Sequence, residues 1–569
     1  MMKGSYQRRE WTRREFLAAG AATGAGLALG GCSAPGVSIS SRPTFDLIVR
    51  GGTLLDGTGA AARTGSVGVR DGRITALGEI PPGASASRVI DASGLHVCPG
   101  FVDIHSHVDT SLIRDPRAES KVRQGVTTEA SGMDGSSAAP LGGPELGQTL
   151  EQFRTETGFE CPYRDMDGYL SLLERQGTAQ NLVTYVGLGT IREVVVGLDD
   201  RRASSDEMER MRREVRRAIE QGARGVSTGL EYTPGSFASS AELAQVVAAA
   251  PEPYRVYATH MRNESDTLLE AIGEAIGIAR DSGARLQISH LKAQNRTNWP
   301  KQRQALDLLE KARRDGMDVH ADRYPYLAYS TDLTALFPLW SRDGGTEKFL
   351  ARLQDPGTLA RIREAVLAKV EGLGSWESVM ITSVVSEEAK LYQGQRINEI
   401  ASLKRVDPFD FTVDLLLREK ARVGMVGFGM NEEGTEMVLA WEYAMVASDA
   451  GAYAPSRSTS RPHPRAYGTF PRAIAVYQKE RKIVTLPEMI RKMTSLPAMK
   501  LGLADRGVLA VGKAADLVIF DERTIRDRAT YVDPHQFPDG IPWVIVNGVP
   551  VVDGGEQTDA LPGRILRST

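Results

Sequence analysis

The sequence is poor in cysteine, in excess charge and in repeats. Its three cysteines, Cys32, Cys98 and Cys161, do not make a disulfide framework. The formal net charge is only −3, from 69 basic and 72 acidic residues, so the charge balance gives no reason to expect nucleic acid as a partner. No internal repeat is visible, which argues against a solenoid or a propeller. What the 569 residues do have is a hydrophobic content of 41%, enough for a large core and more than one small domain.

The N-terminus also lacks an apolar run long enough to remain as a membrane span. Residues 12–17 read TRREFL, which has the form of a twin-arginine export signal, and the apolar run 18–29 that follows is short. The next residues, LGGC, have the form of a lipoprotein processing site with Cys32 acylated. The other interpretation is a chance cysteine after a cleaved leader. We expect an export signal at 1–32, a tether at 33–44, and a lipoprotein anchored in a membrane through Cys32, facing the periplasm or the cell exterior.

Short strands broken by glycine occur near both ends of the mature chain. They are expected over residues 45–50, 53–56, 66–69, 73–77, 516–520 and 543–548. Between them, eight strand candidates alternate with amphipathic helices, of which residues 205–221 are the clearest. The eight strands are expected at 100–104, 126–130, 182–186, 225–228, 255–259, 286–289, 318–322 and 445–448.

This alternation predicts an α/β fold, a (β/α)8 TIM-like barrel of the kind found in metal-dependent hydrolases, over residues 99–500. The two chain ends, 45–98 and 501–569, would form a split small β-sandwich domain, because short sheets need a partner to bury their apolar face. The interval before the eighth strand is oversized, so an inserted subdomain, able to act as a lid, is expected at about 332–440.

Polar side chains with metal-binding chemistry close several of these strands. His105 and His107 are two residues apart at the end of an apolar run and therefore project from the same face of a strand. His260 and His290 each end a further run, and Asp449 ends the last one. A lone histidine at such a place is more often structural, but in a barrel all these strand ends face one mouth. Imidazoles there would bind Zn²⁺ or a similar ion, and a carboxylate would carry protons, which together favour metal-assisted hydrolysis.

The motifs around these residues resemble the amidohydrolase superfamily and, within it, the N-acyl-D-amino-acid deacylases (D-aminoacylases). The resemblance runs from about Phe45 to the end and rests on PGFVDIHSHVD, QGVTTEASGMDGSSAAP, VSTGLEYTPGSFA, YATHMRNES, ISHLK, DRYPYLAYST, ASDAGA and RPHPRAYGTFPR. It implies that His260 and His290 hold one tightly bound zinc, and that His105 and His107 belong to a second, weaker site. It further implies that Asp449 is the general base, which takes a proton from the attacking water and returns it to the departing amine.

The sequence departs from the family pattern at the second strand. D-Aminoacylases have a cysteine ligand in a Gly-Asn-Cys-Gly stretch, where residues 132–135 here read GMDG. Asp134 therefore stands in the place of the cysteine, and a carboxylate can ligate zinc. Glu129, at the end of the preceding strand, is the rival candidate, and Asp134 could instead be an ordinary turn aspartate beside glycine. A smaller departure is Leu188, where many relatives have a polar residue.

An N-acyl amino acid carries a carboxylate, which calls for a cation and hydroxyl donors. The resemblance places Tyr232, Lys292, Tyr324 and Arg465 around it, with Ser289 beside His290. The alternative for Lys292 and Arg465 is a solvated loop charge or a structural ion pair. The prolines at 462 and 464 restrict the backbone before Arg465, which suits a positioned group. His463 is expected to be structural, and the sequence assigns no role to the histidines at 96, 320 and 535.

We therefore expect a zinc-dependent amidohydrolase that cleaves the linear amide of N-acyl amino acids, of D configuration by the resemblance, with a small molecule as its substrate. One alternative is a dihydroorotase-like or isoaspartyl-dipeptidase-like enzyme that acts on cyclic amides or dipeptides. Those relatives usually bridge two metals through a modified lysine on strand four, and residues 225–229, GVSTG, contain no lysine. Another alternative is a non-catalytic binding lipoprotein. The only feature that supports a binding lipoprotein is Asp134 in the place of the family's cysteine ligand. The presence of Asp449 argues against it, because a binding protein has no need of a proton-transfer group.

Overall fold

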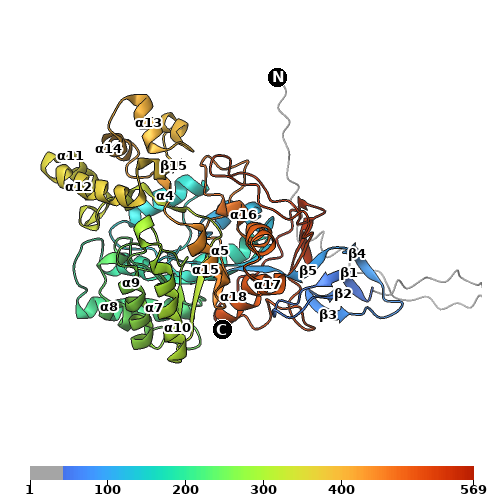
Figure 1. Cartoon of the computed structure of the whole chain (residues 1–569). Coiled ribbons are helices and arrows are strands. Elements are labelled where there is room, and N and C mark those ends of the chain that lie inside the picture. The colour runs from blue at the N-terminus through green and yellow to red at the C-terminus, as the bar shows by residue number, and fades with distance from the viewer. Residues whose placement is uncertain (1–42) are drawn as a thin grey trace, which may run out of the picture. The chain divides into compact units, whose positions relative to one another are not determined.

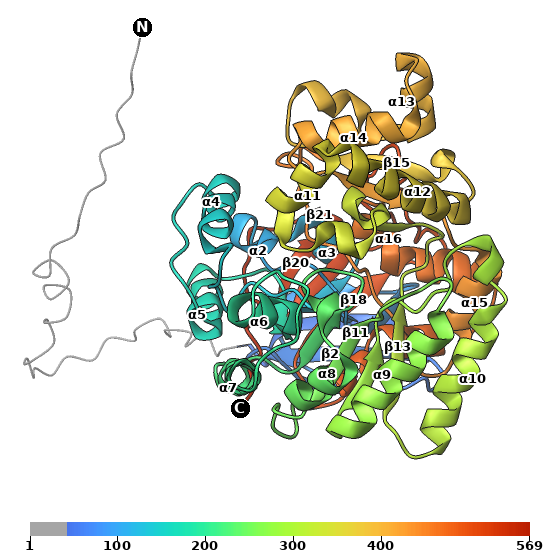
Figure 2. The ribbon, with the colours of Figure 1, turned by 90° about the vertical axis from the view of Figure 1, so that its left-hand side faces the viewer.

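The computed structural model describes residues 43–569 (Figures 1 and 2). The predicted export signal, Cys32 and the tether up to residue 42 lie outside the described residues. Within the described part of the chain, no helix combines the length and the apolar character needed to cross a membrane.

Both ends of the described chain contribute to one nine-stranded sheet. β18 from the C-terminal end lies between β5 and β19 and pairs antiparallel with each. The sheet joins β1 (Phe45–Leu54), β2 (Arg63–Arg70), β3 (Arg73–Gly78), β4 (Ala86–Asp91), β5 (His96–Pro99), β18 (Leu517–Phe520), β19 (Trp543–Val546), β20 (Val549–Asp553) and β21 (Glu556–Gln557). Apolar residues from both ends of the sequence, such as Val67, Val97, Ile519 and Ile545, share its buried core.

One local prediction in this domain is wrong. The sequence predicts two strands with a turn at Gly51-Gly52, but β1 continues through the pair as a single strand. The register against β2 shifts between Val49 and Gly52, and Gly51 has φ = +73°. The glycines therefore form a β-bulge, which absorbs an extra residue without reversing the chain.

All eight predicted barrel strands are present and parallel, which confirms the fold class. They are β6 (Phe101–Asp103), β7 (Val126–Ser131), β8 (Asn181–Thr184) with β9 (Val186–Gly187), β10 (Val226–Gly229), β11 (Val256–His260), β12 (Arg285–Ile288), β13 (Val319–Arg323) and β17 (Ala444–Val446). Only Tyr185 separates β8 from β9, so the two form one barrel strand. The barrel closes just beyond β6 and β17, where Asp449 N donates to His105 O (2.8 Å) and His107 N donates to Ala450 O (3.1 Å).

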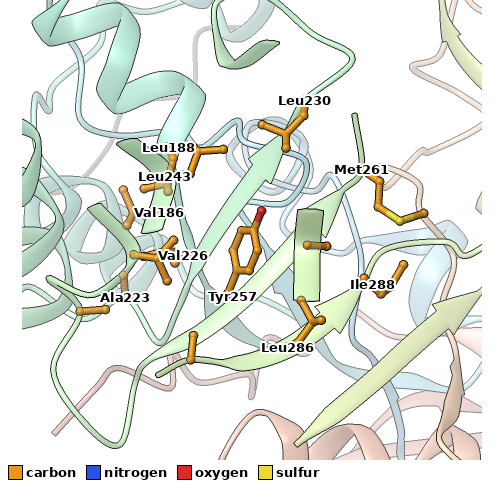
Figure 3. Packing of buried hydrophobic residues seen from close by; sticks show 14 of the residues in the cluster. Val186, Leu188, Ala223, Val226, Leu230, Leu243, Tyr257, Met261, Leu286 and Ile288 are labelled. Carbon is orange, nitrogen blue, oxygen red and sulfur yellow. The ribbon is translucent and has the colours of Figure 1, made fainter. Parts of the chain in front are cut away.

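Helices cover the outside of the barrel, and Figure 3 shows apolar side chains of the strands, among them Val226 and Leu286, in the layer beneath them. The helix predicted at 205–221 is observed as α7 (Ser205–Glu220), which Ser204 and Glu207 begin with a capping box. The other helices are α2 (Ser111–Arg114), α3 (Glu119–Val122), α4 (Leu146–Thr157), α5 (Met166–Gln176), α6 (Leu188–Val195), α8 (Ser240–Val247), α9 (Leu268–Ser282), α10 (Lys301–Arg314), α15 (Glu432–Ala440), α16 (Arg465–Arg472), α17 (Leu486–Met493) and α18 (Ser495–Lys500).

The segment inserted between β13 and β17 has a sheet and a core of its own (Figure 1, yellow to orange). Its strands β14 (Tyr329–Asp332), β16 (Gly424–Gly427) and β15 (Val379–Ser383) form an antiparallel sheet. Its helices are α11 (Gly345–Gln354), α12 (Pro356–Leu373), α13 (Ile397–Lys404) and α14 (Pro408–Arg418). The inserted body thus spans 329–428 and not 332–440, because α15 contacts α10, β13 and β17 and belongs to the helical layer of the barrel.

Candidate metal centre and active site

Four histidines converge on one carboxylate oxygen at the mouth of the barrel. His105 and His107 follow β6, His260 ends β11, and His290 follows β12. Asp134 Oδ2 lies 3.4 Å from His105 Nε2, 3.6 Å from His107 Nε2, 3.7 Å from His260 Nδ1 and 3.3 Å from His290 Nε2. Asp449 joins the group through Oδ1, which is 3.0 Å from His107 Nε2. We call these six residues the histidine centre.

The structure distinguishes between Asp134 and Glu129, the two acidic residues near the second strand that the sequence offers as metal ligands. Asp134 lies among the histidines, whereas Glu129 is fully buried and turned away from them. Glu129 Oε2 accepts a hydrogen bond from Ser106 Oγ (3.2 Å), and Oε1 lies 3.3 Å from Lys121 Nζ. Of the two, only Asp134 is placed to share a metal with the imidazoles.

Three residues of the histidine centre have left-handed backbones, which residues other than glycine rarely adopt. The φ angles are +52° at Asp134, +35° at His290 and +51° at Asp449. Such a conformation costs about 1–3 kcal/mol and persists only where the surroundings hold it. At Gly132 the loop passes so close to β8 and β9 that a Cβ atom there would lie 2.0 Å from the carbonyl oxygen of Tyr185. Tight packing thus directs the Asp134 side chain toward the histidines.

Three further carboxylates face the outward ring nitrogens of the histidines. Asp322 Oδ1 lies 3.3 Å from His105 Nδ1, Glu231 Oε2 lies 3.2 Å from His260 Nε2, and Glu264 Oε1 lies 2.9 Å from His290 Nδ1. In metal sites such partners fix the tautomer and the orientation of the ring, so that the other nitrogen faces the ion. Here each of the three inward nitrogens points at Asp134.

The electrostatics of the centre call for a positive charge among the carboxylates. Burial disfavours the imidazolium form, yet hydrogen bonds to Asp134 and Asp449 raise the pKa of His107 to about 9. Against the same cost of burial, Glu264 and Asp134 raise the pKa of His260 to about 10. Burial would raise the pKa of Asp134 too, but the neighbouring histidines hold it well below its usual value.

Several buried atoms of the centre also make no hydrogen bond, namely the inward Nε2 of His105, Nδ1 of His260 and Oδ1 of Asp134. Nitrogen and carboxylate donors left free around one point fit a divalent metal such as zinc. Two sets of side chains in the centre have ligand atoms close enough to share an ion. The first set is His105, His107, Asp134 and Asp449, and the second is Asp134, His260 and His290. Asp134 belongs to both sets.

Asp449 lies between a histidine and a cation. Its Oδ2 accepts a hydrogen bond from Arg465 Nη1 at 2.7 Å, opposite the contact of Oδ1 with His107. Burial would raise the pKa of Asp449, but Arg465 and His105 hold it well below its usual value, so the carboxylate is ionised. Arg465 Nε is buried and makes no hydrogen bond, so one donor of the guanidinium group is left unsatisfied.

A cavity of about 490 Å³ opens above the centre, and Tyr232, Lys292, Tyr324 and Arg465 line it. Lys292 and Arg465 are only 3% and 5% exposed, so neither is a solvated surface charge. Lys292 Nζ is bound to Glu264 (2.6 Å) and lies 2.8 Å from His290 Nδ1. The hydroxyls of Tyr324 and Ser289 are buried without partners, although Ser289 does not line the cavity.

Leu188, the other position at which the sequence departs from the family pattern, is buried in the apolar layer of the barrel.

The histidines outside the centre contact the rest of the fold. His463 Nδ1 accepts from Arg465 N and its Nε2 lies 3.0 Å from Ala328 O, which positions the start of α16. His535 bridges Tyr467 OH and Ser460 O. His320 pairs with Asp318, and His96 stacks on Phe520.

Sequence reasoning missed the outer carboxylates Glu231, Glu264 and Asp322, and also Lys121. The three carboxylates stand inside conspicuous motifs, GLEYTPG, YATHMRNES and DRYPYLAYST, so a signal for them was present. Nothing in the sequence marks Lys121, which reads as one more charge on a short amphipathic helix.

Comparison with known proteins assigns the chain to a family of hydrolases. The model of the amidohydrolase family matches residues 88–326 and 445–552, on either side of the insertion. The chain belongs to the amidohydrolase family. The predicted family is thereby confirmed.

Relatives within this family extend over almost the whole chain. A D-aminoacylase from Alcaligenes xylosoxydans xylosoxydans is 32% identical over 533 residues, covering 94% of this chain and 100% of that protein. The structure of an N-acyl-D-glutamate deacylase from Bordetella bronchiseptica, complexed with zinc and a phosphonate mimic of the tetrahedral intermediate, has a TM-score of 0.78. It is 32% identical, and the match covers 92% of this chain and 99% of that one. A D-aminoacylase described as having a binuclear metal centre, with one-metal activation and second-metal attenuation, has a TM-score of 0.76 at 33% identity over 92% of this chain and 100% of that chain.

Proposed function

We propose that this amidohydrolase is a zinc-dependent enzyme that hydrolyses the amide bond of N-acyl amino acids, with D-amino acids as the leaving group. The observation that carries the proposal is the histidine centre, where four imidazoles and two carboxylates meet beside a buried arginine, and all of them except His105 line one cavity. The D configuration and the acyl-amide substrate follow the names of the relatives, a D-aminoacylase and an N-acyl-D-glutamate deacylase.

The residues that would hold zinc are His260, His290 and Asp134 at the tight site, with His105 and His107 at a second, weaker position that shares Asp134. Their free nitrogen and oxygen atoms fit the ligand preference of zinc. When bound, zinc supplies a Lewis acid that polarises the amide carbonyl and makes water a stronger acid near neutral pH.

Asp449 is the group that we assign to proton transfer. Its carboxylate is ionised, and its Oδ1 is held at the edge of the cavity by His107. It would accept a proton from the attacking water and deliver it to the nitrogen of the departing amine. The hydrolysis then leaves a carboxylic acid and a free amino acid.

Arg465 and Tyr324 are suited to the α-carboxylate of the leaving amino acid. The guanidinium group of Arg465 has an unpartnered Nε and its Cζ lies 4.6 Å from the centroid of the Tyr324 ring, whose hydroxyl is also free. A buried cation and hydroxyls together recognise a carboxylate by charge-assisted hydrogen bonds. We assign Tyr232 to the same substrate site, and Lys292 to it through its contact with His290. Ser289, which the resemblance also places there, lies outside the lining of the cavity.

The experiment that tests this function measures zinc content and hydrolysis together. The chain from residue 33 onward would be incubated with matched N-acetyl-D- and N-acetyl-L-amino acids, and release of the free amino acid would be followed. We expect bound zinc and turnover selective for the D series. Zinc with turnover only on dipeptides or cyclic amides would refute the substrate class, and neither zinc nor turnover would favour a binding protein.

The Asp449→Asn variant tests the role of Asp449 in proton transfer. We expect turnover to fall by about 10²- to 10⁴-fold, the usual contribution of a positioned acid–base group. Zinc at the tight site should stay near wild type, because Asp449 is not among the His260, His290 and Asp134 set, whereas the midpoint of thermal unfolding should fall, because Arg465 loses its buried counter-ion. Undiminished turnover in this variant would refute the assignment of Asp449 as the base.

We also propose that the protein is exported by the twin-arginine route and anchored in the membrane by a lipid on Cys32. The support is the sequence TRREFL, the apolar run after it and the LGGC stretch. With Cys32→Ser, the protein should move from the membrane fraction to the soluble fraction after cell lysis. A variant that stays membrane-bound would contradict the anchor.

A further inference from the structure

A second cavity adjoins the one above the histidine centre. Its volume is about 650 Å³, larger than the 490 Å³ of the first. The two share one wall, which includes Tyr232, Thr331 and Asp332. Beyond this wall, the second cavity runs between α4 on one side and the inserted segment on the other, where Thr149 and Thr334 line it. We call it the outer chamber.

The outer chamber lies across the barrel mouth from the proposed proton-transfer group. It is reached past Glu193 and Thr233, which follow β9 and β10, whereas Asp449 follows β17. In the sheet, β13, β12 and β11 stand between those strands and β17. None of His107, Asp449 and Arg465 lines the outer chamber.

The positions of Asp449 and Arg465 determine the direction in which a substrate would lie in the cavity. If Asp449 delivers a proton to the departing amine and Arg465 holds the α-carboxylate, the amino-acid half of the substrate lies at their end of the cavity. The acyl half is bonded to the other side of the scissile carbonyl and therefore extends away from Asp449. That direction leads past Tyr232 toward the outer chamber.

The space is much larger than a short acyl group requires. Pockets that enclose a drug-sized ligand measure about 300–1,000 Å³. The first cavity alone reaches that range and would hold an N-acetyl amino acid with room to spare. An acetyl group would leave the outer chamber without a role in binding.

The chemistry of the walls indicates what occupies the chamber. Most of its lining residues carry a hydroxyl, an amide or a charge, including the exposed side chains of Gln148 and Gln152 from α4 and of Arg422 from the inserted segment. A long hydrocarbon chain would have to desolvate these groups without satisfying them, which is unfavourable. A chain of amide groups would exchange hydrogen bonds with them.

We propose that the outer chamber is a subsite for an extended, polar acyl group of the peptide type, so that the preferred substrates are peptidyl-D-amino acids and not N-acetyl-D-amino acids. The proposal rests on the proposed function and names its substrate class. In the reaction, water adds across the last amide bond. The C–N bond breaks, the hydroxyl joins the acyl carbon, and the proton goes to the amine of the released D-amino acid.

The test compares two substrates with the same leaving group, N-acetyl-D-X and N-acetylglycylglycyl-D-X, where D-X is the amino acid most readily released from the N-acetyl series. We expect kcat/KM to be at least about tenfold higher for the longer substrate, because remote binding energy contributes to the transition state. Mass spectrometry should detect N-acetylglycylglycine and free D-X as the only products.

Variants that fill the chamber link this gain to its location. Thr334→Trp on the inserted segment and Thr149→Trp on α4 narrow the chamber from opposite walls, whereas Thr334→Val and Thr149→Val keep its size. The tryptophan variants should lose the preference for the longer substrate and keep the turnover of N-acetyl-D-X, which also shows that they fold. The valine variants should behave like wild type.

The outcomes separate this inference from the proposed function. Hydrolysis of N-acetyl-D-X with no gain for the longer acyl group would overturn the subsite alone. A gain that survives both tryptophan variants would also overturn it, as would a loss confined to substrates with a bulky D-X side chain. Absence of hydrolysis with both substrates would overturn the proposed function, and the subsite with it.

Discussion

Two groups of buried charged side chains lie next to each other at the ends of the barrel strands, and they differ in what they leave free. The histidine centre leaves ring nitrogens of His105 and His260 and an oxygen of Asp134 without hydrogen bonds and lines a cavity. The second group, which we call the Lys121 cluster, consists of Asp103, Lys121, Glu129 and Ser448 and is sealed from solvent.

Within the Lys121 cluster the charges face one another, and the one buried oxygen without a hydrogen bond, Glu129 Oε1, is in ion-pair contact with the lysine. Lys121 Nζ lies 3.0 Å from Asp103 Oδ2, 3.3 Å from Glu129 Oε1 and 2.6 Å from Ser448 Oγ. Asp103 Oδ1 also accepts from Ser448 N at 2.9 Å, directly before Asp449. The lysine thus ties the ends of the first, second and eighth strands together.

The difference teaches how to distinguish a structural polar cluster from a functional one. Both are buried and rich in carboxylates, and both draw one acidic residue from the segment around the second strand. A cluster whose carboxylates share a buried cation and face no cavity stabilises the fold, whereas one with unpaired atoms beside a cavity is built for a ligand. Four predictions test this distinction, in order of decreasing effect.

Removing the lysine should damage the fold more than removing the central aspartate. Lys121→Met leaves two carboxylates buried without a cation, so the free energy of unfolding should fall by about 3–5 kcal/mol. Asp134→Asn should change it far less in the metal-free protein, because Asp134 borders the cavity. Urea unfolding in the presence of a chelator measures the free energy of unfolding of both variants. Equal losses in the two variants would contradict the distinction between the Lys121 cluster and the histidine centre.

Zinc affinity should show the opposite order. Asp134→Asn removes the oxygen shared by four histidines, so we expect zinc affinity to fall by more than the 10- to 100-fold typical of an outer residue. Glu129→Gln should leave affinity unchanged, because its carboxylate contacts only Ser106 and Lys121. Competition with a chromophoric chelator would measure both constants. A loss in Glu129→Gln alone would make Glu129 the ligand.

The outer carboxylates should have an intermediate effect on metal binding. Glu264→Gln weakens the contact that orients His290, so zinc affinity should fall by about 10- to 100-fold. Glu264→Asp keeps the charge and should restore part of the affinity. A variant with unchanged affinity would show that Lys292, whose Nζ lies 2.8 Å from His290 Nδ1, holds the ring without it.

The Lys121 cluster should also shape the dependence of stability on pH. Burial and the nearby Asp103 raise the pKa of Glu129 to about 7, against the attraction of Lys121, because two carboxylates share one lysine. A pKa that is higher in the folded state gives stability that is present at low pH and lost as the pH rises through about 7. Relative to Glu129→Gln, the metal-free wild type should lose about 2 kcal/mol between pH 5 and pH 8. Parallel stability curves for the two proteins would contradict this.

Much of the fold was visible in the sequence because each barrel strand is a short apolar run with a recognisable end. The histidines at 105, 107, 260 and 290 and Asp449 could be predicted for the same reason, since the barrel brings all these strand ends together. The inserted body was visible as an oversized interval. Its boundary at 428 was not, because α15 has the same local pattern as the helices of the insertion.

The sequence by itself determined the barrel, its split β domain, the family and the residues that end the strands, because these depend on local pattern and motif. Only the tertiary structure places Asp134, and not Glu129, among the histidines. They lie five residues apart, and their roles depend on side-chain direction and on partners such as His290, which is 156 positions away from Asp134. The same holds for Lys121, whose partners Asp103 and Ser448 are 345 residues apart, and for the outer chamber, whose walls come from α4 and the insertion. Such contacts form only when distant segments pack together, so no local pattern could specify them.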